Sequence, residues 1–367
     1  MPNLPLGIGV IGCGVISEIY LQRCETFPQI KAVAVADMNI KAAKKRGEQF
    51  GVPAMSVEEL LANPAVDIVL NLTIPAAHVE VGLKAIAAGK HVYLEKPLGT
   101  SVAEARTLLD AANAKGLRVA CAPDTFLAGC HQPARALIDA GAIGRPIAGT
   151  STLMWAGHER WHPNPDFYYT AKGGGPAMDM APYYLTDLVN LLGPVAEVAA
   201  FSSRAESTRT IATGPRAGQI VPVEVDTHLA GVLRFASGAI VQIVTSFDIK
   251  GHKHLPLEIY GTESTLIVPD PNTFIGTVER LDGKEWVTEP LSHGHGDENY
   301  RGIGLADLAD AIVNNRPHRA SGELALHVLE VIEAMHRAGD EKRTVSITTT
   351  VERPAPFAPG LKTGEIA

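Results

Sequence analysis

The stretch LGIGVIGCGVISEIY, residues 6–20, joins an apolar run to a glycine loop and then to a segment with helical character. The run Leu6–Ile11 predicts a strand, and Gly12, Gly14 and Ser17 occupy the three positions of a GxGxxG-like pattern. Gly12 permits a tight turn, and Gly14 lets backbone amides approach a pyrophosphate at the N-terminus of the following helix. Ser17 is small enough for close helix–strand packing. The stretch therefore predicts the start of a dinucleotide-binding fold.

The segments after this stretch alternate between strand and helix patterns. Ser56 followed by Glu59 indicates a capping box, and Gly51, Gly89 and Gly116 are suited to ending helices. Continuous apolar strands separated by helices predict a doubly wound parallel sheet, a Rossmann domain at 1–124. The further strands are expected at 31–37, 67–73, 91–97 and 117–123, and the helices at about 17–25, 39–50, 57–62, 75–88 and 101–115.

The pattern changes after Pro123, where longer strands replace the strand–helix alternation. The pairs Ser237-Gly238 and Asp282-Gly283 suggest antiparallel hairpins. We expect residues 125–367 to form an α+β domain on a large, mostly antiparallel open sheet, with an extended or loosely packed tail from Arg353. Its strands are predicted at 147–156, 195–203, 226–235, 239–248, 257–260, 265–268 and 277–281, and its helices at about 132–140, 300–314 and 322–337.

The composition of the chain disfavours some classes of binding partner. The formal net charge of −8 disfavours nonspecific binding to nucleic acid or to an anionic membrane. The four cysteines form no CxxC pair, so we expect reduced thiols and a cytoplasmic protein. The start MPNLPLGIGVIGCG lacks a basic region before its apolar run, which is typical of a strand rather than a signal peptide. No apolar run is long enough to span a bilayer.

Asp37 ends the second predicted strand, where a carboxylate accepts hydrogen bonds from an adenosine ribose. A carboxylate repels a 2′-phosphate, so Asp37 favours NAD, with NADP as the alternative cofactor. The alternative role of Asp37 is an N-cap for the helix that follows it. The basic residues of that helix predict a solvated face; they are Lys41, Lys44, Lys45 and Arg46.

Glu95-Lys96-Pro97 ends a predicted parallel strand, at the edge where open α/β sheets bind ligands. A lysine there could hydrogen-bond a substrate hydroxyl and stabilise developing alkoxide charge. The alternative is an ordinary surface charge at a strand end.

With the glycine loop, the stretches TIPAAHVEVGLKAIAAGKHVYLEKPLG (residues 73–99) and GGGPAMDMAPYY (residues 173–184) resemble the glucose–fructose oxidoreductase / inositol dehydrogenase / rhizopine catabolism (Gfo/Idh/MocA) family. The resemblance covers most of the chain. It implies an NAD(P)-dependent oxidoreductase that transfers hydride at a secondary hydroxyl or ketone of a sugar, glycoside or cyclitol. It also implies a homodimer or homotetramer that assembles through the C-terminal sheet.

The resemblance assigns roles by position. Lys96 matches the catalytic lysine and Asp179 the acid after the glycine run, while Tyr183 stands where many members have histidine. Lys96 and Tyr183 would contact the reacting hydroxyl, and one of them would take its proton while Asp179 orients the substrate. Ala181 and Thr186 depart from the family pattern, which affects the substrate contacts. The cofactor-binding positions are Gly12, Gly14, Val15, Ile16, Asp37, Thr73, Pro75, His78, Glu95 and Lys96.

Pro176 and Gly193 suit the two ends of a helix, on which Asp179, Tyr183 and Asp187 follow at intervals of four. Met178, Ala181, Leu185, Leu188 and Leu192 form a separate apolar stripe, so we expect the polar face to look into a cleft. The alternatives are an Asp179 that only complements the helix dipole in the first turn and a Tyr183 that is a half-buried aromatic residue.

The segment 154–175 is rich in aromatic and histidine residues and leads directly into that helix. It predicts a sugar-facing wall, with a surface loop or subunit contact as the alternative, and His162 is a reserve acid/base. The substrate candidates are Asp124, Trp155, His158, Trp161, His162 and Tyr168.

The pairs His252/His254 and His293/His295 lack companion ligands in the sequence, so we expect loop histidines and no metal. Two other functions stay open. One is an NAD-dependent glycoside hydrolase that oxidises a sugar transiently, and the other is a non-catalytic dinucleotide sensor.

Overall fold

The computed structural model describes residues 3–170 and 173–366, and the chain divides into two compact units. Unit 1 contains Met1–Gly129, Ser292–Leu326 and Pro354–Ala367, and unit 2 contains Cys130–Leu291 and His327–Arg353. Two late segments of the chain thus belong to unit 1, and the division falls within the long helix α9 (Gly322–Glu341). The division into a dinucleotide-binding domain, residues 1–124, and a substrate and oligomerisation domain, residues 125–367, remains a proposal.

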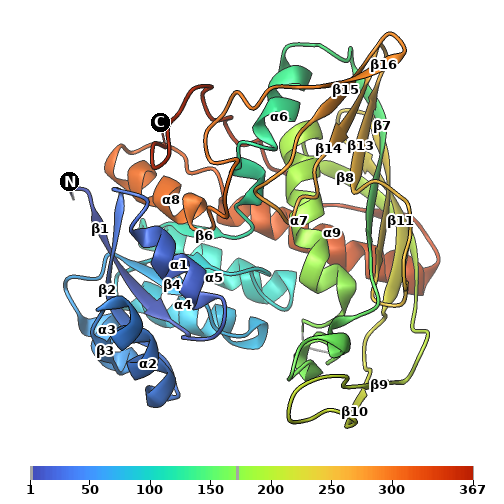
Figure 1. The fold of residues 1–367 in the computed structure, drawn as a ribbon. Coiled ribbons are helices and arrows are strands. Elements are labelled where there is room, and N and C mark those ends of the chain that lie inside the picture. Colours follow the sequence, from blue (N-terminus) through green and yellow to red (C-terminus); the bar gives the residue numbers. More distant parts are fainter. Residues whose placement is uncertain (1–2, 171–172, 367) are drawn as a thin grey trace. The chain divides into compact units, whose positions relative to one another are not determined.

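Unit 1 is built on a six-stranded sheet with the order β3-β2-β1-β4-β5-β6 (Figure 1). All of its strands pair in parallel, and β1 lies between β2 and β4. This arrangement confirms the predicted doubly wound sheet. Its strands are β1 (Leu6–Ile11), β2 (Ile30–Ala36), β3 (Ala54–Met55), β4 (Ile68–Asn71), β5 (His91–Leu94) and β6 (Val119–Cys121).

The α-helices of unit 1 begin and end close to the predicted positions, except that residues 75–77 of the predicted helix 75–88 form a separate 3-10 helix, and the 3-10 helix at 125–127 was not predicted. Ser56 and Glu59 form the predicted capping box, with the two side chains bonded reciprocally to backbone N–H groups. Gly51 ends α2 in the left-handed conformation. The helices are α1 (Ser17–Cys24), α2 (Ile40–Phe50), α3 (Val57–Ala62), the 3-10 helix η1 (Pro75–Ala77), α4 (His78–Ala87), α5 (Val102–Ala114) and the 3-10 helix η2 (Thr125–Leu127).

The late segments of unit 1 add helix α8 (Ile303–Val313) and the C-terminal tail. The buried Asp307 of α8 pairs with both Arg316 and Arg319. The Arg319 guanidinium lies 4.3 Å from the ring centroid of Phe357, and that ring is only 3% exposed. The tail is therefore anchored at Phe357, so the expectation of loose packing is wrong there.

Unit 2 is built on a nine-stranded sheet with the order β16-β15-β14-β13-β7-β12-β11-β8-β17 (Figure 1). Only the β7–β12 pair is parallel among its described pairings, which confirms the mostly antiparallel sheet. The two predicted hairpins are present, one turning at Ser237-Gly238 and the other at Gly283-Lys284, where Asp282 pairs with Glu285. The strands are β7 (Pro146–Met154), β8 (Val195–Ser203), β11 (His228–Phe235), β12 (Ile240–Ser246), β13 (Leu257–Gly261), β14 (Thr265–Val268), β15 (Glu279–Asp282), β16 (Glu285–Thr288) and β17 (Val345–Ser346).

Helix α7 (Gly175–Leu192) lies against β7, β11 and β12, and it also contacts α6 (Gln132–Asp139). An apolar cluster surrounds its first turns, with Met180, Tyr183 and Tyr184 packed among residues of β7 and of the loops. A short two-stranded sheet that the sequence did not reveal, β9 (Thr208–Thr210) with β10 (Ile220–Pro222), also belongs to this unit. The other members of the cluster are Leu153, Tyr169, Ile211, Val221, Val223 and Phe247.

Candidate functional site

The glycine loop has the geometry that a pyrophosphate needs. Gly12 adopts a φ of +103°, and a Cβ there would lie 2.6 Å from the carbonyl carbon and oxygen of Leu72 at the end of β4. At Gly14, by contrast, no atom of the described residues would lie within 4 Å of an added Cβ. Gly12 is therefore required by the fold itself, whereas the space beside Gly14 fits a ligand at the start of α1.

Asp37 follows β2 and braces this loop. Its Oδ2 accepts a hydrogen bond of 2.8 Å from the backbone N–H of Cys13, and its Oδ1 accepts one of 2.7 Å from Asn39. Asn39, not Asp37, is the N-cap of α2, because its side chain accepts from the N–H of Lys41. The alternative that Asp37 caps the helix is therefore wrong. Each carboxylate oxygen keeps a second lone pair for a ribose hydroxyl.

Arg46 of α2 holds the same loop from outside. Its Nη2 donates to the Gly14 carbonyl oxygen at 3.1 Å, and its Nη1 donates to Glu18 Oε2 at 2.9 Å. The Arg46 side chain is only 12% exposed, so the predicted solvated face is wrong at this residue. The three lysines of the helix, Lys41, Lys44 and Lys45, are exposed as predicted.

The ends of β4 and β5 are joined by a buried histidine. His78 Nδ1 lies 2.7 Å from the Pro97 carbonyl oxygen, and Nε2 lies 3.0 Å from that of Thr73. Burial lowers the pKa of His78, although these carbonyl contacts oppose the shift. Asn71 completes the connection, because it donates to the His78 carbonyl oxygen and accepts from the hydroxyl of Thr73. Pro75, in η1, begins the turn between Thr73 and His78.

Lys96 follows β5 at the carboxyl edge of the sheet, and it is half-buried. Its backbone N–H donates to Oε2 of Glu95 at 3.0 Å. Oε1 of the same carboxylate accepts a hydrogen bond of 2.8 Å from the hydroxyl of Tyr20 on α1. The Glu95 side chain, predicted to line the cofactor, is therefore engaged with the protein at both oxygens.

Asp124, a predicted substrate contact, is 1% exposed. Its Oδ2 accepts hydrogen bonds from the N–H groups of Gly302 and Gly304 at 2.8 and 3.1 Å, at the N-terminus of α8. Burial raises the pKa of Asp124, and these two hydrogen bonds limit the rise. This arrangement favours a structural role for Asp124.

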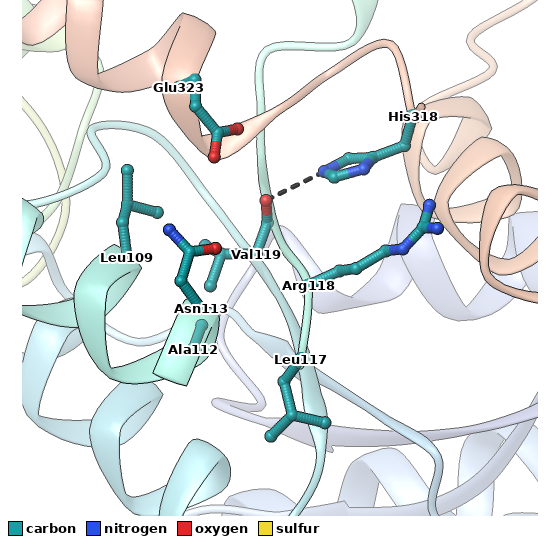
Figure 2. Close-up of a pocket in the computed structure, with 8 residues that line it drawn as sticks. All are labelled: Leu109, Ala112, Asn113, Leu117, Arg118, Val119, His318 and Glu323. Carbon is teal, nitrogen blue, oxygen red and sulfur yellow. Dashed lines mark hydrogen bonds between the residues drawn. The ribbon is translucent and has the colours of Figure 1, made fainter. Parts of the chain in front are cut away.

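Figure 2 shows a pocket in unit 1, lined by residues near the end of α5 and by Val119 at the start of β6. Glu323 and Asn113 point toward each other there, and His318 Nε2 contacts the Val119 carbonyl oxygen at 2.9 Å. The pocket encloses about 70 Å³, which is far too small for a dinucleotide. This pocket is therefore no candidate for the cofactor.

In unit 2, the start of α7 depends on its glycines. Gly174 is the N-cap, and a Cβ there would lie 2.9 Å from the Tyr168 carbonyl oxygen, so a larger residue would push the two segments apart. Asp179 lies beyond the first turn of the helix, and its Oδ2 is 3.3 Å from His158 Nε2. The alternative that Asp179 only complements the helix dipole in the first turn is therefore wrong.

The face shared by Asp179, Tyr183 and Asp187 is not uniformly open. Tyr183 is 6% exposed and packs in the apolar cluster, so it is more deeply buried than the half-buried aromatic residue of the alternative. Asp187 is fully buried, and its Oδ2 lies 3.1 Å from Nδ1 of His131 on the segment before α6. The expectation that the whole polar face looks into a cleft is wrong at Asp187, because a buried histidine faces it.

The aromatic segment forms one connected cluster around His158. The imidazole stacks on Tyr168 with ring centroids 3.7 Å apart, and it also contacts the rings of Trp155 and Trp161. His162 contacts Trp161 and Tyr168 edge-on, and its Nδ1 accepts from the N–H of Asn164. All five predicted wall residues thus meet, and His158 rather than His162 lies against Asp179.

Polar residues absent from the sequence predictions hold this cluster in place. The Tyr169 hydroxyl donates to Glu159 Oε2 and accepts from the N–H of His158. Arg209 pairs with Glu159 and with Asp248, and its guanidinium lies 5.7 Å from the Tyr169 ring centroid. No local pattern in the sequence indicates this network, because its members come from segments as distant as β9 and the end of β12.

The HxH pairs are loop residues with different surroundings. His252 and His254 are exposed and have ring centroids 6.0 Å apart, whereas His295 is 2% exposed and accepts from the N–H of Gly364 at 3.0 Å. Among residues 3–170 and 173–366, no cluster of three or more His, Cys, Asp or Glu side chains could hold a metal ion. None of the described helices has the length and hydropathy needed to cross a membrane.

Known proteins share both parts of this architecture. Residues 6–122 match the oxidoreductase family with an NAD-binding Rossmann fold, and residues 131–267 match the GFO/IDH/MocA C-terminal domain. An uncharacterized oxidoreductase of Synechocystis sp. is 31% identical over 280 residues, covering 74% of this chain and 73% of that protein. The 1,5-anhydro-D-fructose reductase of Ensifer adhaerens is 28% identical, covering 93% and 98%. The crystal structure of an aldose-aldose oxidoreductase from Caulobacter crescentus has a TM-score of 0.78 at 25% identity, covering 93% and 99%.

The parallel sheet, the glycine loop and these matches define an NAD-binding oxidoreductase. The chain belongs to the Gfo/Idh/MocA family, in agreement with the resemblance drawn from its motifs.

Proposed function

We propose that this protein transfers hydride between NAD and a secondary hydroxyl or ketone of a sugar, glycoside or cyclitol. The observation that carries the proposal is the placement of Lys96 at the carboxyl edge of the NAD-binding sheet, beside the His78 bridge between β4 and β5. The names of the Ensifer and Caulobacter relatives, a reductase and an oxidoreductase of sugars, support this substrate class. The Asp37 carboxylate favours NAD over NADP.

The proposed roles separate by unit. In unit 1, Lys96 hydrogen-bonds the reacting hydroxyl and stabilises the charge that develops on its oxygen. In unit 2, Asp179 orients the substrate and Tyr183 is the other candidate to take the hydroxyl proton, while His158 holds the Asp179 carboxylate. NAD supplies the hydride chemistry when it is bound. Trp161, 59% exposed, offers an aromatic face for the CH groups of a sugar ring.

The test is a screen of sugars, glycosides and cyclitols with NAD, read as NADH absorbance, with Lys96→Met in parallel. We expect turnover by the wild type and a loss of at least about a thousandfold in the variant, which is the scale of general acid–base catalysis. Normal turnover by Lys96→Met would refute its role. Glycoside cleavage without accumulated NADH would indicate the hydrolase alternative, and ligand binding without turnover would indicate the sensor.

We further propose that the sheet of unit 2 joins copies of the chain in a homodimer or homotetramer. Its strands bury one face, and the other carries exposed apolar residues in register: Val232 pairs with Ala199 and Gln242, and Ala230 pairs with Phe201. Phe201 is 72% exposed, and apolar surface of this kind commonly marks an interface. The four cysteines are unpaired and buried, which supports a reducing, cytoplasmic location. Light scattering of the purified protein measures the oligomeric state.

A further inference from the structure

We propose that Tyr20 is a positioning residue for catalysis: its hydroxyl, through the Glu95 carboxylate, fixes the backbone from which the Lys96 side chain projects. The inference rests on the proposed function for the role of Lys96, but the contacts that carry it all lie within unit 1. Tyr20 comes from α1, the helix that begins at the glycine loop.

The two oxygens of the Glu95 carboxylate have different hydrogen-bond partners. Oε1 of Glu95 accepts from the Tyr20 hydroxyl at 2.8 Å, and Oε2 accepts from the Lys96 N–H at 3.0 Å. Glu95 is 8% exposed and Tyr20 is 1% exposed, so water does not readily replace either bond. Losing the Tyr20 hydroxyl would leave a buried carboxylate oxygen without its donor, and the side chain would reorient.

The Glu95 carboxylate also restrains the backbone at Lys96. The Glu95 backbone N–H is fixed to the Asn71 carbonyl oxygen, and the side chain reaches forward over the next peptide group. Lys96 comes directly after the last residues that the sheet holds, since β5 ends at Leu94. The Glu95 carboxylate therefore restrains the one peptide N–H that sets the direction of the Lys96 side chain. Misplacement of a catalytic group by about 1 Å costs up to about a hundredfold in rate.

Tyr93 provides a matched control for Tyr20. Tyr93 is as buried as Tyr20 and packs edge-on against it, with ring centroids 6.3 Å apart. Burial raises the pKa of the Tyr93 hydroxyl. A Cβ added at Gly304 would lie 2.8 Å from both this hydroxyl and the Cβ of Asp124, so the two groups border the same glycine. Replacing Tyr93 by phenylalanine removes the same atom from the same ring pair without touching the Tyr20–Glu95 hydrogen bond.

The test compares Tyr20→Phe with Tyr93→Phe in the full chain. We expect Tyr20→Phe to lower kcat about tenfold while the Kd for NAD stays within about twofold, and Tyr93→Phe to change both by less than about twofold. A deuterium isotope effect on the oxidised carbon should increase in Tyr20→Phe, because the hydride step becomes slower. Equal loss of kcat in both variants, or an NAD affinity that falls in parallel with kcat, would overturn the proposal.

A readout independent of activity separates this proposal from the proposed function. The Lys96 amide is held by Glu95, so its hydrogen exchange should speed up by about tenfold in Tyr20→Phe and stay unchanged in Tyr93→Phe. Unchanged exchange in Tyr20→Phe overturns the positioning role even if the enzyme oxidises sugars. Faster exchange in a protein whose Lys96→Met variant turns over normally shows that the catalytic assignment of Lys96 is the part that failed.

A double-mutant cycle tests the path through Glu95. Glutamine in place of Glu95 has one acceptor oxygen and an NH2 group that only donates, so it cannot accept from Tyr20 and from the Lys96 N–H with separate atoms. We expect Glu95→Gln to lower kcat, and the double variant Tyr20→Phe/Glu95→Gln to lose less than about twofold more. Full additivity of the two losses would contradict the path. If Tyr20→Phe fails to fold, Glu95→Asp carries the test, because its shorter carboxylate cannot span both donors.

Discussion

Unit 1 and unit 2 place their functional side chains by different physical means. In unit 1, Gly12, Asp37, Thr73 and Lys96 each lie in the loop that follows a parallel strand, so the sheet itself brings them to one edge. In unit 2, Asp179 meets His158 only because α7 and the aromatic segment are held together. The first arrangement follows from backbone pairing, and the second from side-chain packing and buried polar contacts.

The difference has consequences for how each unit tolerates change. The carboxyl edge of unit 1 is carried by main-chain hydrogen bonds, which most side-chain substitutions leave intact. The cluster in unit 2 depends on the chain Tyr169–Glu159–Arg209–Asp248, in which every member is needed to satisfy a buried charge. We therefore expect unit 2 to be the more sensitive of the two.

The most direct test of this difference between the units is to substitute the two histidines of the aromatic segment separately. His158→Asn removes the partner of Asp179 and leaves a gap against Tyr168, so we expect kcat/KM to fall by about a hundredfold. His162→Asn should change kcat/KM by less than about twofold. His162, which the sequence nominated as a reserve acid/base, contacts only aromatic edges and a backbone N–H among the interactions described. Steady-state kinetics decides; a larger loss in His162→Asn would reverse the assignment.

The glycine loop offers a matched pair for unit 1. Gly14→Ala adds a methyl group where the described residues leave open space, so we expect an unchanged melting temperature and a Kd for NAD raised about tenfold. Gly12→Ala places its methyl 2.6 Å from the Leu72 carbonyl group at a φ of +103°, so it should destabilise the fold itself. Calorimetry and NAD titration separate the two effects. An unaffected NAD affinity in Gly14→Ala would show that the pyrophosphate lies elsewhere.

The smallest expected effect is a pH dependence of stability from the buried pair in unit 2. Burial alone would lower the pKa of His131, but Cys130 and Asp187 raise it well above its ordinary value. A raised folded-state pKa gives stability that is complete below about pH 6.5 and is lost as the pH rises toward the folded pKa, at no more than about 1.4 kcal/mol per pH unit. Urea unfolding of the wild type and of His131→Asn at pH 6 and pH 8 measures this. The wild type should lose free energy of unfolding over this interval and the variant should lose less; a parallel loss would contradict the assignment.

Much of unit 1 could be predicted because its signals are local. The capping box of Ser56 with Glu59, the left-handed Gly51 and the strand Leu6–Ile11 depend on residues within a few positions of one another. Asp37 and Lys96 could be nominated because the end of a parallel strand is recognisable from its apolar run. The bracing of the glycine loop by Arg46 could not, since its contact with Gly14 spans 32 residues and the helix pattern only indicated a charged surface.

The partners of α7 could not be predicted from the sequence pattern either, because they are distant in the sequence. Spacing of four residues correctly aligned Asp179, Tyr183 and Asp187 on the helix, but it carried no information about what each would face. Asp187 is buried against His131, and Asp179 is paired with His158, from two different segments. Periodicity describes a helix in isolation, whereas burial depends on every element that packs around it.

Local chemistry along the chain was thus sufficient to predict the parallel sheet, its glycine loop and the hairpins, because turns, caps and strand ends depend on adjacent residues. The family followed from the resemblance of the motifs. The pairing of Asp179 with His158, the network beneath it and the Tyr20–Glu95–Lys96 connection exist only in the folded chain. Each of them satisfies buried polar groups with partners from distant segments, and a buried group takes whichever partner the packing brings within hydrogen-bond distance.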